Sequence, residues 1–270
     1  MHTGDTAQRS LQHWSDQGIA EMEAFYVLAA EDYRQLALAV DWATLLGEHA
    51  HERWTLLDVA CGSGKFPTAL LEIPSVAALP AIAYDLLDPS AFSVATARAS
   101  LAPPFIPRND LVMPLQELAL DGSSYDIVWA THALYAIPPG ELDLAMACFA
   151  SALAPEGLGV IAQATARSHY LAFYDAFRAG VREATPYISA EMVATSLRTA
   201  GVEVREQMIT YETGTSDRGV AEGFLQRCAF DDSVSLEEME AAPVLGDYLA
   251  SCRRSDGSYV FRHEVAMLWM

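Results

Sequence analysis

The chain is poor in basic side chains. Its 270 residues include 16 Lys and Arg against 36 Asp and Glu, a formal net charge of −20. Such a field repels nucleic-acid phosphates and anionic membrane surfaces, so neither nucleic acid nor a membrane is expected as a partner. Neutral or cationic small molecules suit the field better, although surface acidity also serves solubility alone.

Cysteines and long apolar runs are scarce too. Cys61, Cys148, Cys228 and Cys252 form no C-x-x-C pair, no zinc-ligand cluster is visible, and no metal is expected. The N-terminal stretch lacks the charged-then-apolar pattern of a secretion signal, and the apolar run 144–155 is too short to span a bilayer. We therefore expect reduced thiols in a cytoplasmic protein.

Two phosphate-binding patterns are missing. The third glycine of a G-x-G-x-x-G sequence beginning at Gly62 is replaced by Pro67, and no G-x-x-x-x-G-K-[ST] sequence occurs. A pyrophosphate needs more backbone donors than this short turn offers. The turn therefore suits a ligand that carries an amino-acid group rather than phosphates.

Short apolar runs alternate with helical stretches in the middle of the chain. This alternation predicts an α/β fold, a Rossmann-like, doubly wound, mostly parallel seven-stranded sheet with an N-terminal helical cap. The strands are expected near 56–60, 81–85, 105–106, 124–130, 157–163, 202–211 and 259–269. Helices are expected near 65–72, 89–101, 141–153, 170–182 and 190–200.

The two ends of the chain differ from this core. Residues 1–50 are interpreted as the helical cap, with two helices within 17–47, and residues 51–270 as the Rossmann-like domain. Within that domain, 231–250 reads as a helical, acidic insert. Six acidic residues and no Lys or Arg in 231–247 indicate a solvated helical face rather than a binding tail.

The strongest signal for a site is the sequence from Asp58 to Lys65, Asp-Val-Ala-Cys-Gly-Ser-Gly-Lys. Gly62 and Gly64 follow a buried strand and precede a helix, where glycine permits a sharp turn and close approach of a ligand. Asp85 ends the second strand, 21 residues after Gly64, and a carboxylate there can accept both hydroxyls of a ribose. Asp110 follows the third strand and can receive the amino group of an adenine.

These motifs resemble the first motif, the ribose-binding acid and the adenine-contacting pair of class I S-adenosylmethionine-dependent methyltransferases. The resemblance covers about 50–165 and implies S-adenosyl-L-methionine as the cofactor. The cofactor contacts that it implies come from Asp58, Ala60, Gly62, Gly64, Asp85, Asp110, Leu111 and Thr131. The competing interpretation is a Rossmann-like domain that has lost its ligand.

The segment after the fourth strand carries a histidine and a tyrosine at the same sheet edge. In the methyltransferase family this position lies beside the transferable methyl group, so His132 is the candidate general base or hydrogen-bonding anchor. Tyr135 is a second catalytic candidate. The alternatives are a histidine that only ties the loop and a tyrosine that only packs.

A narrower resemblance concerns the substrate. The sequence His132-x-Leu134-Tyr135, the helix pair before the first strand and the final-strand segment 261–264 are similar to histamine N-methyltransferases. The resemblance implies substrate contacts from Glu31, His132 and either Arg262 or His263. Where that family has Gln and Asn, this chain has His132 and a basic residue, so the substrate itself stays open.

Aromatic residues gather in the segments expected over the site. Tyr26 and Tyr33 in the leading helices and Tyr170 after the sheet are the candidate substrate contacts among them. Aromatic faces stabilise a sulfonium cation and exclude water, although each single ring is also suited to core packing.

Three functions fit this sequence. The first is methyl transfer to nitrogen or oxygen of a small-molecule metabolite, in specialised metabolism. The second is cyclisation of the cofactor itself, in which its amino group displaces methylthioadenosine and closes an azetidine ring. The third is a non-catalytic cofactor-binding protein. The oligomeric state stays open, with a homodimer as one option.

Overall fold

The computed structural model describes residues 5–13, 19–48, 54–119 and 124–270. The strands are β1 (Thr55–Val59), β2 (Ile82–Leu87), β3 (Phe105–Leu111), β4 (Tyr125–Thr131), β5 (Leu153–Ala164), β6 (Arg205–Thr215) and β7 (Tyr259–Trp269). They form one sheet in the order β3-β2-β1-β4-β5-β7-β6. The first five strands are parallel, and β7 runs antiparallel to both β5 and β6. The predicted seven-stranded Rossmann-like sheet is confirmed.

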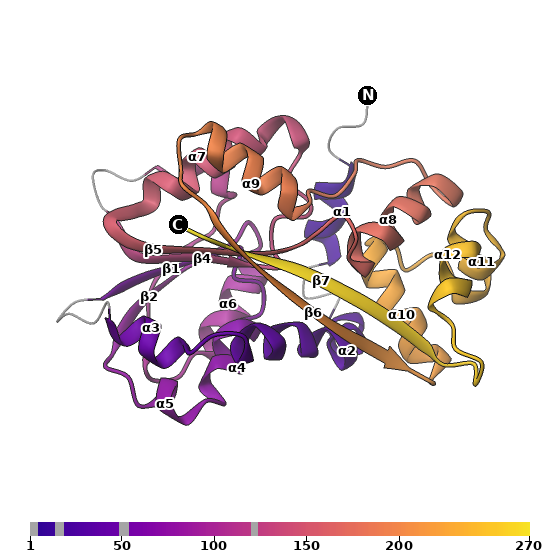
Figure 1. Cartoon of the computed structure of the whole chain (residues 1–270), viewed down its shortest axis with the longest axis horizontal. Helices are drawn as coiled ribbons and strands as arrows, with labels where there is room; N and C mark the ends of the chain where they lie inside the picture. The colour runs from indigo at the N-terminus through magenta and orange to yellow at the C-terminus, as the bar shows by residue number, and fades with distance from the viewer. Residues whose placement is uncertain (1–4, 14–18, 49–53, 120–123) are drawn as a thin grey trace.

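The helices lie on both faces and at one end of this sheet (Figure 1). Before the first strand come α1 (Asp5–His13), α2 (Ile19–Leu38) and α3 (Trp42–Glu48). Between the strands lie α4 (Lys65–Leu71), α5 (Pro74–Ala77), α6 (Ala91–Ser100), α7 (Leu142–Ala152), α8 (His169–Gly180) and α9 (Ala190–Thr199). Between β6 and β7 lie α10 (Arg218–Ala229), α11 (Leu236–Ala241) and α12 (Leu245–Cys252). Two short 3-10 helices cover Leu115–Glu117 and Pro139–Glu141.

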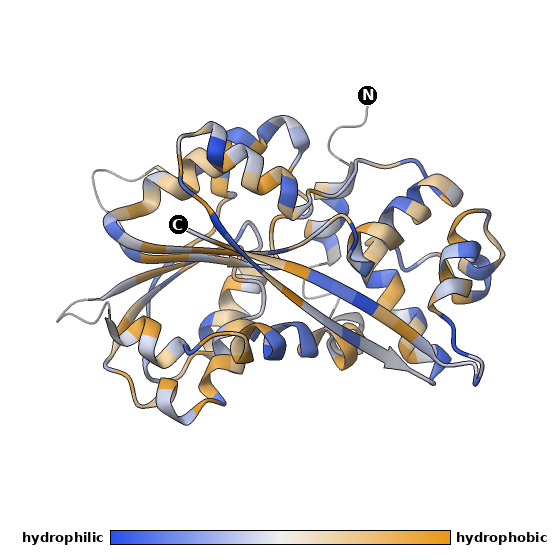
Figure 2. Ribbon diagram, viewed as in Figure 1, coloured by the Kyte–Doolittle hydropathy of each residue, from blue (hydrophilic) through white to orange (hydrophobic). Residues whose placement is uncertain are grey.

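The buried side chains form three clusters. One cluster joins the helices α2, α3, α4, α5 and α6 to one face of the sheet. A second cluster joins α7 and α9 to the other face. A third binds α8, α10, α11 and α12 to the far half of the long β6–β7 hairpin, which extends beyond the parallel strands (Figure 1). Figure 2 shows hydrophobic residues along the central strands and a hydrophilic stretch in the middle of the hairpin.

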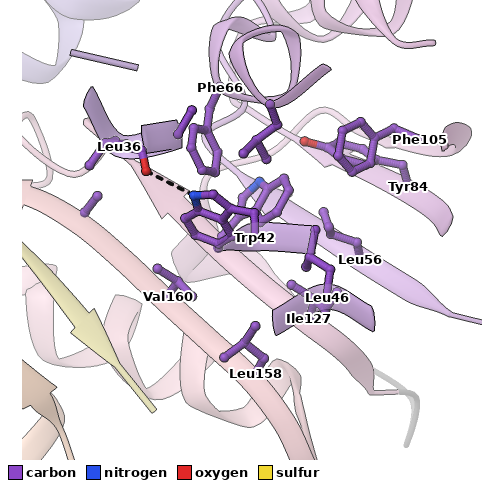
Figure 3. Packing of buried hydrophobic residues seen from close by; sticks show 14 of the residues in the cluster. Leu36, Trp42, Leu46, Leu56, Phe66, Tyr84, Phe105, Ile127, Leu158 and Val160 are labelled. Carbon is purple, nitrogen blue, oxygen red and sulfur yellow. Dashed lines mark hydrogen bonds between the residues drawn. The ribbon is translucent and has the colours of Figure 1, made fainter. Parts of the chain in front are cut away.

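Aromatic rings fill the first cluster. Trp42 of α3 meets Phe66 of α4 at a centroid distance of 5.3 Å and Trp129 of β4 at 6.3 Å. The buried indole N–H of Trp42 donates to the carbonyl of Leu36 at 3.0 Å (Figure 3). This packing fixes the end of α2 against the sheet and so positions the α2 side chains that overhang the strand ends.

Two strands run past the ends that the sequence predicts. β2 continues two residues beyond Asp85, to Leu87, and β3 extends to Leu111, so that Asp110 lies inside it. Parallel pairing explains the extension, since Leu87 pairs with Val59 of β1 and with Leu111 of β3. The acidic insert 231–250 contains α11 and most of α12, and a capping box of Ser235 and Glu238 starts α11.

Candidate functional site

A cavity of about 500 Å³ lies at the carboxyl ends of β1, β2 and β4. Ligands bind at this edge in open α/β sheets, where the strand order reverses around the first strand. α1 and α2 supply further walls. The residues used below that line the cavity are Tyr26, Tyr33, Asp58, Ala60, Gly62, Ser63, Lys65, Leu87, Asp88, Leu115, Gln116, Thr131 and His132.

The glycine turn forms the cavity floor by backbone conformation. Gly62 has φ +51°, and a Cβ added there would meet no heavy atom within 4 Å, so the space beside it is open to a ligand. Gly64 has φ +72° and packs on α6 instead, where a Cβ would lie 3.1 Å from the Cα of Ala97. Gly62 and Ala60 thus line the cavity, whereas Gly64 shapes the turn from outside it.

Asp88 is the carboxylate that faces the cavity after β2. It accepts the backbone N–H of Gly62 at 3.1 Å and that of Ser90 at 2.8 Å, which ties it to the glycine turn and to the start of α6. Burial raises its pKa to about 6, against which these two hydrogen bonds act. Each carboxylate oxygen keeps a lone pair for a further donor.

Asp85 lies elsewhere, contrary to the expectation that it reaches the ligand. It is fully buried within β2 beside Leu57 and does not line the cavity. Its carboxylate accepts five hydrogen bonds, from Arg108, Asn109 and the hydroxyl of Tyr125. Burial opposes ionisation, but these bonds prevail and lower its pKa. The sequence analysis ends β2 at Asp85, whereas the strand continues to Leu87 and the carboxylate that reaches the cavity is that of Asp88.

The other expected cofactor residues divide in the same way. Thr131 lines the cavity, and so does Asp58, although the hydroxyl of Tyr84 already donates to the Asp58 carboxylate at 2.7 Å. Burial raises the pKa of Asp58 to about 7. Asp110 is exposed and paired with Arg98 at 2.9 Å, outside the cavity. Leu111 also lies outside, where its carbonyl accepts the N–H of Asp88.

α2 places two tyrosines over the turn. The hydroxyl of Ser63 donates to that of Tyr26 at 2.9 Å, and the Lys65 ammonium lies 4.4 Å from the Tyr26 ring centre. Tyr33 meets the ring of His132 edge-on at 5.9 Å. One wall of the cavity is therefore aromatic and faces the loop that follows β4.

A smaller cavity of about 80 Å³, here called the annexe, shares Tyr33 and His132 with the large cavity. Tyr135 and Tyr170 line it too, as the sequence places them near the site. Among the described residues, its one carboxylate is Asp32 of α2, which is buried. Other lining residues are Phe25, Tyr187, Arg227, Cys228 and Phe230.

His132 lies between the two cavities in a fixed position. Its backbone takes φ +52° and its N–H donates to the Ala162 carbonyl at 2.8 Å. The ring Nδ1 lies 2.7 Å from the Tyr135 hydroxyl, which also accepts the N–H of Ala164 at 3.3 Å. Nε2 is buried and has no hydrogen-bond partner in the described part of the chain. Burial lowers the pKa of the ring to about 4.

The two substrate residues implied only by resemblance lie outside both cavities. Glu31 accepts hydrogen bonds from Arg34 and Gln35 on the outer side of α2. His263 is fully buried behind the annexe, where its Nε2 lies 2.9 Å from the hydroxyl of Thr213 and its Nδ1 3.9 Å from Asp32. The helical register places Asp32, not Glu31, on the face of α2 that meets the sheet.

Sequence reasoning misses Asp88, Asp32 and helix α1. Asp88-Pro89 could be found as the true end of the second strand, because a proline there stops the ladder. The signal for Asp32 is its spacing from Leu28 and Phe25, four and seven residues earlier on the same helix face. α1, which contributes Gln8 and Leu11 to the large cavity, carries no comparable signal.

Residues 56–157 match the family model described as a methyltransferase domain. No curated protein matches the chain significantly. Three solved structures share the fold. A Bacillus halodurans protein assigned as a methyltransferase is 14% identical over 85% of this chain and 97% of that one, with a TM-score of 0.59. Magnesium protoporphyrin IX methyltransferase from Synechocystis, with bound S-adenosylhomocysteine, is 14% identical over 94% and 96%, with a TM-score of 0.53.

A Thermotoga maritima S-adenosylmethionine-dependent methyltransferase, described as a possible histamine N-methyltransferase, is 16% identical over 74% of this chain and 84% of that one, with a TM-score of 0.51. Residues 56–157 therefore match a methyltransferase domain, and the chain shares its fold with S-adenosylmethionine-dependent methyltransferases of known structure.

Neither a metal site nor a membrane-spanning helix is found in the described part of the chain. No group of three or more His, Cys, Asp or Glu side chains among residues 5–13, 19–48, 54–119 and 124–270 is arranged to hold a metal ion. Across the same ranges, none of the helices has the length and hydropathy needed to cross a membrane.

Proposed function

We propose that this methyltransferase acts on a nitrogen or oxygen atom of a small molecule, with the cofactor in the large cavity and the acceptor atom at its border with the annexe. One observation carries the proposal. The loops after β1, β2 and β4 line one cavity, and His132 at its inner end also lines a second, much smaller one.

The residues of the large cavity fit S-adenosylmethionine. The open space beside Gly62 admits a ligand against the backbone, and Asp88 offers carboxylate oxygens to the two ribose hydroxyls. Leu87 and Leu115 give apolar walls for the adenine, and the amide of Gln116 provides a donor and an acceptor for its polar edge. In this assignment Asp88 replaces Asp85 and Asp110 as the acidic contact.

The sulfonium fits the aromatic side of the cavity. Tyr26 and Tyr33 are the rings of α2 that line it, and a cation is stabilised by aromatic faces within about 6 Å. Bound there, the cofactor supplies an already activated methyl group for in-line displacement. The protein's part is then alignment and exclusion of water, and alignment alone contributes up to roughly 7–11 kcal/mol in well-oriented reactions.

The small volume of the annexe supports a small acceptor group. At about 80 Å³ the annexe is much smaller than the large cavity of about 500 Å³, so it suits one end of a small acceptor rather than a second molecule of the cofactor's size. A macromolecular substrate would have to present an equally small group. The charge of −20 further disfavours nucleic acid.

Turnover tests the proposal directly. The purified chain is incubated with S-adenosylmethionine and a panel of small amines and alcohols, and S-adenosylhomocysteine and methylated products are quantified by mass spectrometry. We expect S-adenosylhomocysteine to form only when an acceptor is present, in equal amount to the methylated product. Rapid release of methylthioadenosine from S-adenosylmethionine alone would contradict methyl transfer and indicate cyclisation of the cofactor.

A matched control variant shows the effect of removing a carboxylate that lies outside both cavities. Asp143→Asn removes a carboxylate of α7 that lines neither cavity, and it should leave both products unchanged. If no product forms with any acceptor although S-adenosylhomocysteine binds, the proposal of a small amine or alcohol acceptor fails and the assignment of the large cavity to the cofactor stands.

A further inference from the structure

The hydrogen bonds of His132 fix which ring nitrogen carries its proton. The Tyr135 hydroxyl accepts the N–H of Ala164, and the described residues offer its own proton one acceptor, Nδ1 of His132 at 2.7 Å. A neutral imidazole that accepts at Nδ1 carries its hydrogen on Nε2. His132 therefore presents an N–H donor at the border of the cavities, and this nitrogen has no lone pair with which to take a proton.

Asp32 is the group in the annexe that can take a proton. Its Oδ1 accepts the hydroxyl of Tyr211 at 2.6 Å and its Oδ2 that of Tyr170, which leaves one lone pair on each oxygen. The side chain is 2% exposed, so its charge is held by these hydroxyls rather than by water. A buried carboxylate that faces a cavity is costly unless a cation or a proton joins it.

The walls around this carboxylate suit a cation. Six aromatic side chains line the annexe, and positive charge is favoured over ring faces. These are Phe25, Tyr33, Tyr135, Tyr170, Tyr187 and Phe230. Aromatic faces together with a carboxylate recognise an ammonium group. The guanidinium of Arg227 also lines the annexe, but Arg227 is not among the groups that shift the pKa of Asp32.

We propose that the acceptor is a small amine, whose ammonium is bound by Asp32 in the annexe and loses its proton to that carboxylate, while the Nε2–H of His132 donates to a polar atom of the acceptor other than the reacting nitrogen and so orients it. The inference rests on the proposed methyl transfer. All atoms and electrons of the reaction are accounted for. The ammonium N–H proton passes to Asp32, and the freed nitrogen lone pair bonds the methyl carbon. The carbon–sulfur bond breaks, sulfur keeps its electron pair, and Asp32 later releases the proton to water.

The carboxylate form is needed for both binding and proton transfer. Burial raises the pKa of Asp32 to about 7, the tyrosine hydroxyls oppose that shift, and Glu31 adds to it. Ammonium binding is therefore lost as the pH falls through about 7 and is present above it. Titratable or charged side chains surround Asp32 from α2, the loop after β4, α8, β6, α10 and β7. They are Glu31, Tyr33, His132, Tyr135, Tyr170, Tyr211, Arg227, Cys228 and His263.

The test compares two probes of the same size, propan-1-amine and propan-1-ol, on the chain saturated with S-adenosylhomocysteine. Saturation-transfer NMR at pH 8 should detect binding of the amine and at least tenfold weaker binding of the alcohol. Asp32→Asn should weaken amine binding at least tenfold. Glu31→Gln, which removes the neighbouring charge outside both cavities, should change it less than twofold.

Tyr211→Phe keeps the carboxylate and tests the pH dependence even if Asp32→Asn fails to fold. Loss of a hydroxyl that lowers the pKa of Asp32 should move the midpoint of amine binding to higher pH. Equal binding of amine and alcohol, or an unmoved midpoint in Tyr211→Phe, overturns the inference. Isothermal titration with S-adenosylhomocysteine separates the two proposals, because failure of cofactor binding defeats the proposed function, whereas intact cofactor binding without amine preference defeats only this inference.

Discussion

Asp85 and Asp88, three residues apart, show how local bonding decides which of two carboxylates serves a ligand. Asp85 has its oxygens occupied by five donors, two of them from Arg108, whereas Asp88 has two backbone donors and faces the cavity. A carboxylate that is already saturated gains little from ribose hydroxyls. We therefore propose Asp88, the acid with lone pairs left over, for the ribose contact.

Replacing Asp85 or Asp88 by asparagine tests which of the two carboxylates binds the ribose. Asp88→Asn should weaken binding of S-adenosylhomocysteine by about 1.5–3 kcal/mol, roughly 10- to 150-fold, because a charged acceptor of two hydroxyls is lost. Asp85→Asn should lower thermal stability, since it breaks the bond to Arg108, yet keep the affinity within about twofold. Isothermal titration measures both, and the reverse order of effects would return the role to Asp85.

At the scale of elements, the sequence predicts the sheet well and the ends of its strands poorly. Buried runs such as 56–60 are apolar whatever follows them, so the strands and the glycine turn emerge from pattern alone. The end of β2 depends on pairing with Val59 and Leu111, which are distant in sequence. With the observed end of β2, the proposed acid moves from Asp85 to Asp88.

Helices that depend on tertiary contacts were also missed. α10 begins at an Asp217 cap, but its apolar face is defined only by packing against α2 and α8. α1 is held through Thr6, whose hydroxyl lies 3.0 Å from that of Tyr174 in α8. The annexe is assembled from α2, α8, α10 and the loop after β4, so its carboxylate could not be chosen from sequence.

The turn between β1 and α4 should tolerate no side chain at Gly64. Gly64→Ala should cost about 1–3 kcal/mol for the left-handed conformation, and its methyl group would press on Ala97 and Ser100 of α6. Chemical denaturation measures the loss. Gly140→Ala is the control, because its Cβ meets nothing within 4 Å and its φ is not positive, and it should change stability by less than about 0.5 kcal/mol. Equal losses in both variants would refute this packing argument.

At the scale of the whole molecule, three cores meet around the two cavities. The two clusters on the sheet faces hold the strand ends, and the third, under the far half of the β6–β7 hairpin, supplies the inner wall of the annexe. The two cavities proposed for cofactor and acceptor thus lie against different packing units and share His132. The net charge of −20 suits the cationic acceptor that we propose.

A crystal structure with S-adenosylhomocysteine tests the account most directly. We predict the ribose hydroxyls within hydrogen-bond distance of the Asp88 carboxylate, the homocysteine part against Gly62, and the sulfur facing His132 and the annexe. Ribose bound at Asp85, or a ligand outside the cavity between β1, β2 and β4, would contradict the account.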